Sequence, residues 1–192
     1  MKLILASKNA HKAMEMQAIL GDGVELITQD KTIAKDIDVV EDGLTFEENA
    51  IKKALTIMKE TGLPTIADDS GLCVDALDGR PGIYTARFAG DNATDDENIS
   101  KLISELEGVK DDARTARFVC VIAVAIPNRE VTTYRGECEG RILTQRQGKN
   151  GFGYDPIFFV PEHGKSMAEL SADVKNSISH RFKALKKLKE SL

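Results

Sequence analysis

The sequence predicts an α/β fold: a mixed, twisted central sheet flanked by helices, in a single domain over residues 1–192. Three observations lead to this expectation. The chain opens with a short apolar run, a polar turn and a helical pattern, as α/β folds with parallel strands do. Three later segments carry the S/T-x-x-E spacing that begins helices. Two strand-like runs are separated by a short turn, which adds an antiparallel pair to the sheet.

Four apolar or β-branched runs predict the strands of this sheet. They are Leu3–Ala6, Pro64–Ala67, Ala116–Ile126 and Val131–Cys138. The first is a short buried strand that leads into a polar turn. The last two flank Pro127-Asn128-Arg129 and are expected to pair as a hairpin.

Apolar spacing and capping signals predict the helices. One helix covers His11–Leu20, and a last one covers about Ser177–Leu188. Three others begin at capping-box pairs, namely Thr45 with Glu48, Thr94 with Glu97 and Ser166 with Glu169. The first of these three ends at Gly62 and the second near Gly108, because glycine commonly follows the last turn of a helix.

The composition is that of a globular protein, with 42% hydrophobic and 30% charged residues. The net charge of −5 argues against a general nucleic-acid binder, which needs a basic surface. Asp36–Glu48 holds six acidic residues and no Lys or Arg, whereas residues 165–192 hold seven Lys or Arg and three acids. These stretches could be a metal site facing a phosphate site, but charge alone favours two solvated surfaces.

The cysteines and the apolar runs bear on the compartment. Cys73, Cys120 and Cys138 have no C-x-x-C spacing, so they suit buried thiols in a reducing compartment better than disulfides or a zinc site. Apolar runs such as Phe118–Ile126 are too short to span a membrane, and the N-terminus does not read as a signal peptide. We therefore expect a cytoplasmic protein without a membrane partner.

The turn after the first strand is a candidate phosphate-binding loop. It comprises Ser7, Lys8, Asn9, Ala10, His11 and Lys12. A helix N-terminus offers unpaired backbone N–H groups and a partial positive charge, and this segment adds two lysines and a hydroxyl. On this segment alone, however, a simple N-cap at Ser7 or Asn9 with exposed lysines is the better explanation.

Two adjacent carboxylates, Asp68 and Asp69, directly follow the strand that ends at Ala67. Carboxylates at a strand end suit a hard cation such as Mg²⁺. Alternation along a strand sends neighbouring side chains to opposite faces, so only one of the two is expected to face the site. Asp pairs before a glycine also occur in ordinary surface turns, which is the alternative interpretation.

Glycines and aromatic rings alternate in Gly148–Pro156. Its glycines permit unusual backbone angles and the close approach of a ligand. Phe152 and Tyr154 could stack on a planar base. A plain loop seldom holds two aromatic residues among glycines, which favours a functional role.

Lys175 and the segment Ser179-His180-Arg181 form the last candidate group. A straight helix would not align Lys175 with His180 and Arg181, so a turn is expected before the last helix. Lys175 alone is equally explained as an exposed helix lysine. Gly164-Lys165-Ser166 is not the end of a P-loop, because Phe159 stands where the first glycine would be required.

Six segments resemble motifs of the inosine triphosphate pyrophosphatase family, also called XTP/dITP diphosphatases, in the family's order along the chain. They are Ser7-x-Asn9-x-x-Lys12, the stretch Glu41–Ala54, Ala67–Leu72, Pro81–Arg87, Gly151–Pro156 and Ser179-His180-Arg181. Any one of them is weak evidence, but six in order are specific. Departures are small: Asn150 replaces a commoner glycine, and Ser7 stands where Thr is frequent.

The resemblance implies two lobes with a substrate cleft between them, a homodimer, and a role for each candidate residue. Asp69 would be the general base that activates water, and Glu41 and Asp69 would bind Mg²⁺. The segment from Ser7 to Lys12, together with Lys53, would hold the triphosphate. The positions around the nucleotide would be Ser70, Phe152, Gly153, Tyr154, Asp155, Lys175, His180 and Arg181, with the last ones reading the base.

The implied reaction is hydrolysis of ITP, dITP or XTP to the monophosphate and pyrophosphate. A related pyrophosphatase for modified pyrimidines or methylated bases is the nearer alternative, and His180-Arg181 with Phe152 favours purines instead. A nucleotide sensor would not need Glu41 and Asp69 together. A nucleic-acid binder conflicts with the negative charge and the clustered acids.

Overall fold

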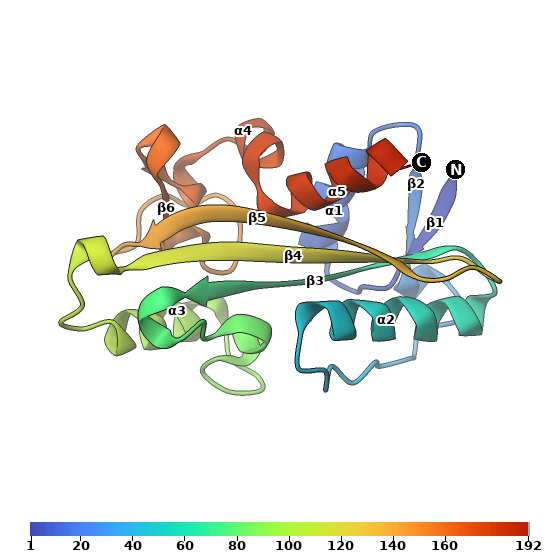
Figure 1. Cartoon of the computed structure of the whole chain (residues 1–192), viewed down its shortest axis with the longest axis horizontal. Helices are drawn as coiled ribbons and strands as arrows, with labels where there is room; N and C mark the ends of the chain where they lie inside the picture. Colours follow the sequence, from blue (N-terminus) through green and yellow to red (C-terminus); the bar gives the residue numbers. More distant parts are fainter. Residues whose placement is uncertain (192) are drawn as a thin grey trace. The chain divides into compact units, whose positions relative to one another are not determined.

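The computed structural model describes residues 1–191 and confirms the α/β class (Figure 1). The strands are β1 (Lys2–Leu5), β2 (Glu25–Thr28), β3 (Thr65–Val74), β4 (Thr115–Ala125), β5 (Thr132–Ile142), β6 (Phe158–Val160) and β7 (Lys165–Ser166). They form one sheet in the order β2-β1-β3-β4-β5-β6-β7. The sheet is mixed, because β1 pairs in parallel with β2 and β3, whereas β6 pairs antiparallel with β5 and β7.

The α-helices are α1 (Ala10–Leu20), α2 (Phe46–Thr61), α3 (Asp95–Glu105), α4 (Ala172–Ile178) and α5 (His180–Ser191). Within the described residues, no helix combines the length and the apolar character needed to cross a membrane.

Contacts within the chain define two compact units. The first comprises Met1–Asp69, Cys120–Gly136 and the residues from His180 onward, and the second comprises Ser70–Val119 and Glu137–Ser179. The boundaries fall inside β3, β4 and β5. A single domain over 1–192, whose last residue lies outside the described part, stays a prediction, and so does the substrate cleft.

In the first unit, helices cover both faces of the sheet. α1 packs against α5 on one face, and α2 lies on the other (Figure 1). The core on the α1 and α5 side includes Leu3, Leu5, Met16, Ile66, Ile122 and Leu185. Parallel strands covered on both faces are apolar throughout rather than alternating, which explains the unbroken run at the start of the chain.

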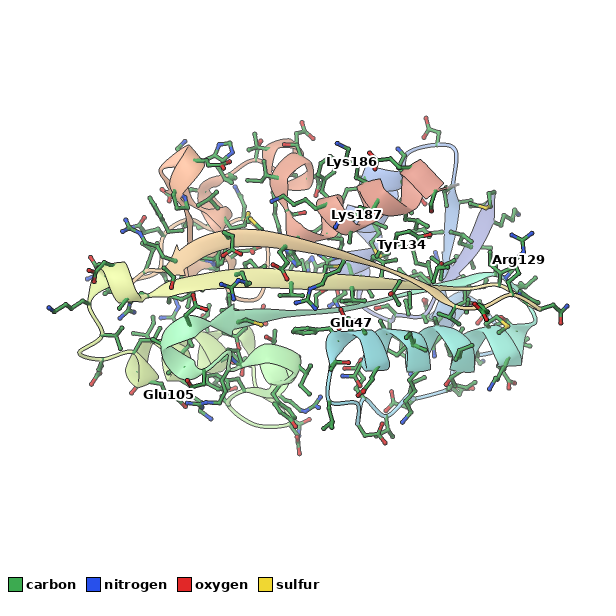
Figure 2. The ribbon with its side chains drawn as sticks, viewed as in Figure 1. Glu47, Glu105, Arg129, Tyr134, Lys186 and Lys187 are labelled. Carbon is green, nitrogen blue, oxygen red and sulfur yellow. The ribbon has the colours of Figure 1, made fainter. Side chains whose placement is uncertain are left out.

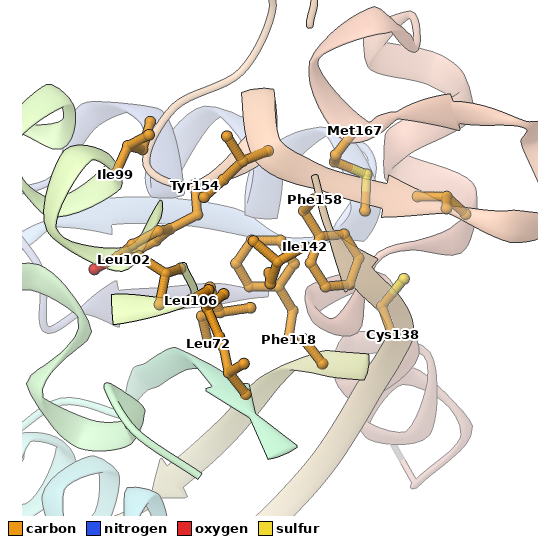
Figure 3. Close-up of a cluster of buried hydrophobic side chains, with 14 of the residues drawn as sticks. Leu72, Ile99, Leu102, Leu106, Phe118, Cys138, Ile142, Tyr154, Phe158 and Met167 are labelled. Carbon is orange, nitrogen blue, oxygen red and sulfur yellow. The ribbon is translucent and has the colours of Figure 1, made fainter. Parts of the chain in front are cut away.

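The second unit has its own apolar core (Figure 3). It joins Leu72 of β3 and Leu102 of α3 to aromatic residues of β4 and β6. The rings of Phe118 and Phe158 lie 4.3 Å apart, centre to centre, at 40°, a tilted arrangement that aromatic pairs favour.

The capping signals are confirmed in part. Thr94 and Glu97 form a complete capping box at the start of α3. At α2, the Thr45 hydroxyl accepts from the Glu48 N–H at 3.1 Å, but the Glu48 carboxylate accepts from the Leu44 N–H at 2.6 Å instead of closing the box. The box of Ser166 and Glu169 begins only the 3₁₀ turn Met167–Glu169, because the backbone is extended again at Leu170.

Two expected boundaries differ from the structure. β3 does not end at Ala67 but runs on to Val74, so Asp68 and Asp69 lie inside the strand. The helix expected over Ser177–Leu188 is interrupted at Ser179, whose extended backbone separates α4 from α5. This interruption confirms the turn that was expected before the last helix.

Candidate active site

Lys53 of α2 is surrounded by three oxygens. Its Nζ lies 2.7 Å from Glu41 Oε1, 2.8 Å from the Asp68 carbonyl oxygen and 3.0 Å from Asp69 Oδ1. Burial alone would lower the pKa of Lys53, but the charges of Asp69, Glu41 and Asp68 raise it above its ordinary value. Lys53 is therefore a buried, charged ammonium that holds the two carboxylates predicted as metal ligands.

Asp69 has one oxygen held and one without a described partner. Its Oδ1 accepts from Lys53, whereas its Oδ2 is buried with no hydrogen bond. Burial raises the pKa of Asp69; the nearby Lys53 charge opposes this and the Glu41 charge adds to it, so the net shift is upward. A buried carboxylate with a free oxygen and a raised pKa suits a general base or a metal ligand.

Asp68 points to a different set of partners, as the alternation of side chains along a strand predicts. Its carboxylate pairs with Lys12 of α1 and accepts from the Arg181 guanidinium at 3.1 and 3.3 Å. The Cys120 thiol of β4 adds a contact at 3.3 Å. Burial alone would raise the pKa of Asp68, but the charges of Lys12, Arg181 and Lys53 hold it well below its ordinary value. Asp68 is thus a permanently charged anchor for two cations.

Arg181, at the start of α5, is fixed by carboxylates. Besides Asp68, its guanidinium donates to Glu15 of α1. Its side chain is 2% exposed. Burial would lower its pKa, but the Asp68 charge raises it above the ordinary value, so the group stays charged. Its described hydrogen bonds go to Asp68 and Glu15, and its role in reading the base stays a prediction.

The position of α5 on β5 depends on Gly136. A Cβ there would stand 2.2 Å from the His180 carbonyl oxygen, a distance no side chain tolerates. Further along the helix, Lys187 donates to the backbone of β5 at 2.6 Å, and the Tyr134 hydroxyl hydrogen-bonds to Ser191 at 2.7 Å (Figure 2). This close packing sets the position of His180 and Arg181 at the first turn.

The segment that carries Glu41 is docked on the first turns of α2. The Gly43 N–H donates to Asn49 Oδ1 at 2.8 Å, and a Cβ at Gly43 would lie 2.7 Å from the same oxygen. Asp42 pairs with Lys52 at 2.6 Å on the exposed side. Asn49 and Lys53, four residues apart on one face of α2, therefore hold this acidic segment together.

The structure confirms the N-cap that the sequence allowed at Asn9, and phosphate binding by this loop stays a prediction. Asn9 is the N-cap of α1, and its side chain accepts from the Lys12 N–H at 3.1 Å. The Ser7 hydroxyl accepts from the Asn9 N–H at 3.1 Å. The segment from Lys8 to His11 is exposed, so its cation and backbone remain accessible to an anion.

Glu41 and Asp69 are the residues that could hold a metal ion. Both reach one and the same cation, the Lys53 ammonium, and Asp69 keeps a buried oxygen without a partner. In residues 1–191, no group of three or more His, Cys, Asp or Glu side chains could coordinate a metal. Mg²⁺ fits such a site, because it commonly takes one or two carboxylates and completes its shell with water and phosphate oxygens.

The second unit brings together Phe152, Asp155 and Lys175. Lys175 Nζ lies 2.7 Å from Asp155 Oδ2 and 4.7 Å from the centre of the Phe152 ring. The Phe152 N–H donates to the same Asp155 oxygen at 3.0 Å. Gly151 has φ +77°, and a Cβ there would collide with Asp155 Oδ2 at 2.0 Å. Lys175 is buried, so the alternative of an exposed helix lysine is wrong.

Tyr154 differs from the expectation that two rings stack on a base. Its ring belongs to the apolar core and is 3% exposed, and its hydroxyl donates to the Thr85 carbonyl at 2.7 Å. Burial and the Asp95 charge raise its pKa. Gly153, beside it, donates its N–H to Asp95 at 2.7 Å. The Tyr154 ring is therefore buried in the core, whereas the Phe152 ring is half-buried and packs against the Lys175 ammonium. Ser70 lies in β3 directly after Asp69.

Sequence reasoning missed the residues that support the site. Glu15, Cys120 and Gly136 showed no motif of their own, and their roles appear only once α1, β4 and β5 are packed. Asn49 stood within a segment that resembled the family, but no role was assigned to it. The available signal was a polar amide four positions before Lys53, on the same face of the predicted helix.

Comparisons with protein families and with known proteins find similarity along the whole chain. The model of the Ham1 family matches residues 3–191. A dITP/XTP pyrophosphatase of Desulforamulus reducens is 52% identical over 192 residues, covering 100% of this chain and 96% of its own. One of Shouchella clausii is 49% identical over 198 residues, with the same coverage of both chains.

Solved structures give the same result. The Staphylococcus aureus Ham1 protein superimposes with a TM-score of 0.90 at 43% identity, covering 100% of this chain and 97% of its own. A HAM1 protein from Coxiella burnetii reaches the same TM-score at 45% identity, covering 100% and 98%. Since motifs, fold and full-length similarity agree, the chain belongs to the Ham1 family.

Proposed function

We propose that this protein is a pyrophosphatase that hydrolyses the non-standard purine nucleoside triphosphates dITP, XTP and ITP to the monophosphate and pyrophosphate. The observation that carries the proposal is the Glu41–Lys53–Asp69 cluster, in which a buried carboxylate keeps an oxygen without a described partner. The relatives whose names include dITP/XTP pyrophosphatase support the choice of substrate.

Asp69 is the residue proposed to activate water. Its Oδ2 accepts a proton from the water, whose oxygen forms a bond to the α-phosphorus while the bond to the bridging oxygen breaks and pyrophosphate leaves. The raised pKa brings the base nearer to neutral pH, where general-base catalysis is most efficient. Such a base contributes about 10²- to 10⁴-fold to the rate.

The cations of the first unit are proposed to bind the triphosphate. Lys12 and Lys53 offer ammonium groups, and the exposed start of α1 offers backbone N–H groups with the positive end of the helix dipole. When bound, Mg²⁺ would be held by Glu41 and Asp69 and would neutralise phosphate charge. Preorganised positive charge stabilises the departing pyrophosphate.

The cluster of Phe152, Asp155 and Lys175 is proposed to recognise the nucleoside. The half-buried Phe152 ring offers a stacking surface, and Asp155 holds Lys175 in place. Hypoxanthine and xanthine carry an oxygen at the purine 6-position, where adenine carries an amino group. A hydrogen-bond donor aimed at that oxygen rejects adenine by roughly 10⁴- to 10⁵-fold, because buried polar groups are otherwise left unpaired.

A panel of nucleotides tests the proposal. Purified protein is incubated with XTP, dITP, ITP, GTP and ATP, with Mg²⁺ and with a chelator, and the products are followed by ³¹P NMR. We expect monophosphate and pyrophosphate, with kcat/KM highest for ITP or XTP, lower for GTP and lowest for ATP, and no turnover in the chelator. Equal hydrolysis of ATP and ITP, or release of single phosphates, would refute it.

A cytoplasmic homodimer without a nucleic-acid partner completes the proposal. The net charge of −5 supports the lack of a nucleic-acid partner. Light scattering of the purified protein distinguishes a dimer of about twice 21.0 kDa from a monomer.

A further inference from the structure

All three N–H donors of the Lys53 ammonium are engaged with oxygen atoms of acidic residues. An ammonium group has three N–H donors, and three oxygens of Glu41, Asp68 and Asp69 lie 2.7–3.0 Å from Nζ. In this arrangement Lys53 has no N–H left for a phosphate oxygen. To bind the triphosphate, it must release at least one of these contacts.

The Lys53 ammonium also lies against the two carboxylates that are expected to bind the metal ion, Glu41 and Asp69. Glu41 and Asp69 together carry two negative charges, and Lys53 supplies one positive charge between them. A divalent cation that binds to these oxygens must displace the ammonium or approach it closely, and both cost free energy where water is excluded. The Lys53 and Asp69 side chains are only 10% and 8% exposed, so water screens this repulsion poorly.

We propose that Lys53 is an internal counter-ion, which occupies the Glu41–Asp69 pair in the free protein and moves to the triphosphate when nucleotide binds. This inference rests on the proposed function of the site. Release of Lys53 frees the carboxylates for the cation, so metal binding and nucleotide binding support one another. By linkage, each ligand raises the affinity for the other by the same factor.

The inference has a measurable consequence for metal binding without nucleotide. The wild-type protein should bind Mn²⁺ weakly, because the ammonium already holds one oxygen of each carboxylate and repels a second cation. Lys53→Gln removes the competing charge and should bind Mn²⁺ on the order of tenfold more tightly, or more, within the roughly 5- to 150-fold range common for coupled sites. The electron paramagnetic resonance signal of free Mn²⁺, titrated at pH 8, reports this affinity without turnover.

Lys52→Gln is the matched control. Lys52 is the neighbouring residue on α2, and its substitution by Gln removes the same charge. It pairs with Asp42, which follows Glu41 in the chain. Both Lys52 and Asp42 are exposed, at 41% and 66%, and neither belongs to the site. Lys52→Gln should bind Mn²⁺ as weakly as the wild type and keep its activity.

The outcomes separate this inference from the proposed function. Equal Mn²⁺ affinity in the wild type, Lys53→Gln and Lys52→Gln overturns the counter-ion role, even if the wild type releases pyrophosphate. If Lys53→Gln binds Mn²⁺ more tightly but the wild type releases no pyrophosphate, the counter-ion role is supported and the proposed function is refuted. If Lys53→Gln does not fold in a chelator, recovery of its melting transition by Mn²⁺ supports the inference. If Lys53→Gln folds neither in a chelator nor with Mn²⁺, Lys53→Arg is tested instead. Because Lys53→Arg keeps the positive charge, it should bind Mn²⁺ weakly, and tight binding of Mn²⁺ would contradict the counter-ion role.

Discussion

The carboxylate of Asp68 should be one of the most stabilising polar groups in the protein, and Asp68→Asn tests this. The substitution keeps the shape but removes the charge that faces the buried Arg181 and Lys12. Removing one partner of a buried ion pair costs about 3–5 kcal/mol, because the remaining charge has lost its compensation. Glu15 still contacts Arg181, which places the expected loss at the lower end, about 3 kcal/mol.

The assay is urea unfolding followed by circular dichroism, with thermal melting as a second measurement. A loss of 3–5 kcal/mol corresponds to a drop in Tm of roughly 6–20 °C for a chain of this size. The pKa of Asp68 is lower in the folded protein than its unfolded value of about 3.9. Its contribution is therefore present above that pH and is lost as the pH falls toward the folded-state pKa, so the two proteins should begin to converge at about pH 4 and coincide only below the folded-state pKa.

Asp42→Asn serves as the control, because it removes the same charge from an exposed pair with Lys52. It should leave the unfolding curve unchanged, as exposed ion pairs contribute little. If Asp68→Asn costs less than about 1 kcal/mol at pH 7, the buried network does not stabilise the fold as argued.

Two further predictions concern the base and the position of α5. Asp69→Asn should lower kcat by about 10²- to 10⁴-fold with unchanged circular dichroism and a melting temperature within a few degrees; near-normal turnover would refute the assignment of Asp69 as the base. Gly136→Ala should destabilise the protein by about 1–3 kcal/mol in urea unfolding, because its Cβ would lie 2.2 Å from a carbonyl oxygen of α5. Gly23→Ala, where an added Cβ meets nothing within 4 Å, should be close to neutral, and equal losses at both glycines would contradict the packing argument.

The elements that the sequence predicted well are those whose signals are local. Capping pairs and apolar spacing located α2 and α3, and the turn before the last helix followed from the geometry of Lys175 relative to His180. The apolar runs located β1, β4 and β5. These signals depend on backbone hydrogen bonds and side-chain periods within a few residues, so they can be recognised without tertiary structure.

The misses depend on tertiary contacts. β3 was expected to stop at Ala67 because the following residues are Asp, Asp, Ser and Gly, which are poor strand formers. Lys12, Lys53 and Arg181 neutralise these carboxylates, and those partners come from three different helices. β2, β6 and β7 are short strands that gain their stability from neighbours in the sheet.

In the candidate site, too, the sequence indicated which residues take part but not what surrounds them in the fold. The resemblance pointed to Asp69, Glu41 and Lys53, and the structure brings these three together. It did not reveal that Arg181 is held by carboxylates or that the Tyr154 ring lies in the core. Both facts depend on what surrounds the side chain, which a motif does not encode.

The central claim is that Asp69 directs water to the α-phosphorus. The identity of the phosphorus atom that water attacks tests this claim most directly. Hydrolysis of XTP in H₂¹⁸O with Mg²⁺, followed by mass spectrometry of both products, shows which phosphorus receives the oxygen of water. If Asp69 directs water to the α-phosphorus, ¹⁸O appears in the monophosphate and the pyrophosphate stays unlabelled. Label in pyrophosphate or in free phosphate would contradict the proposed mechanism.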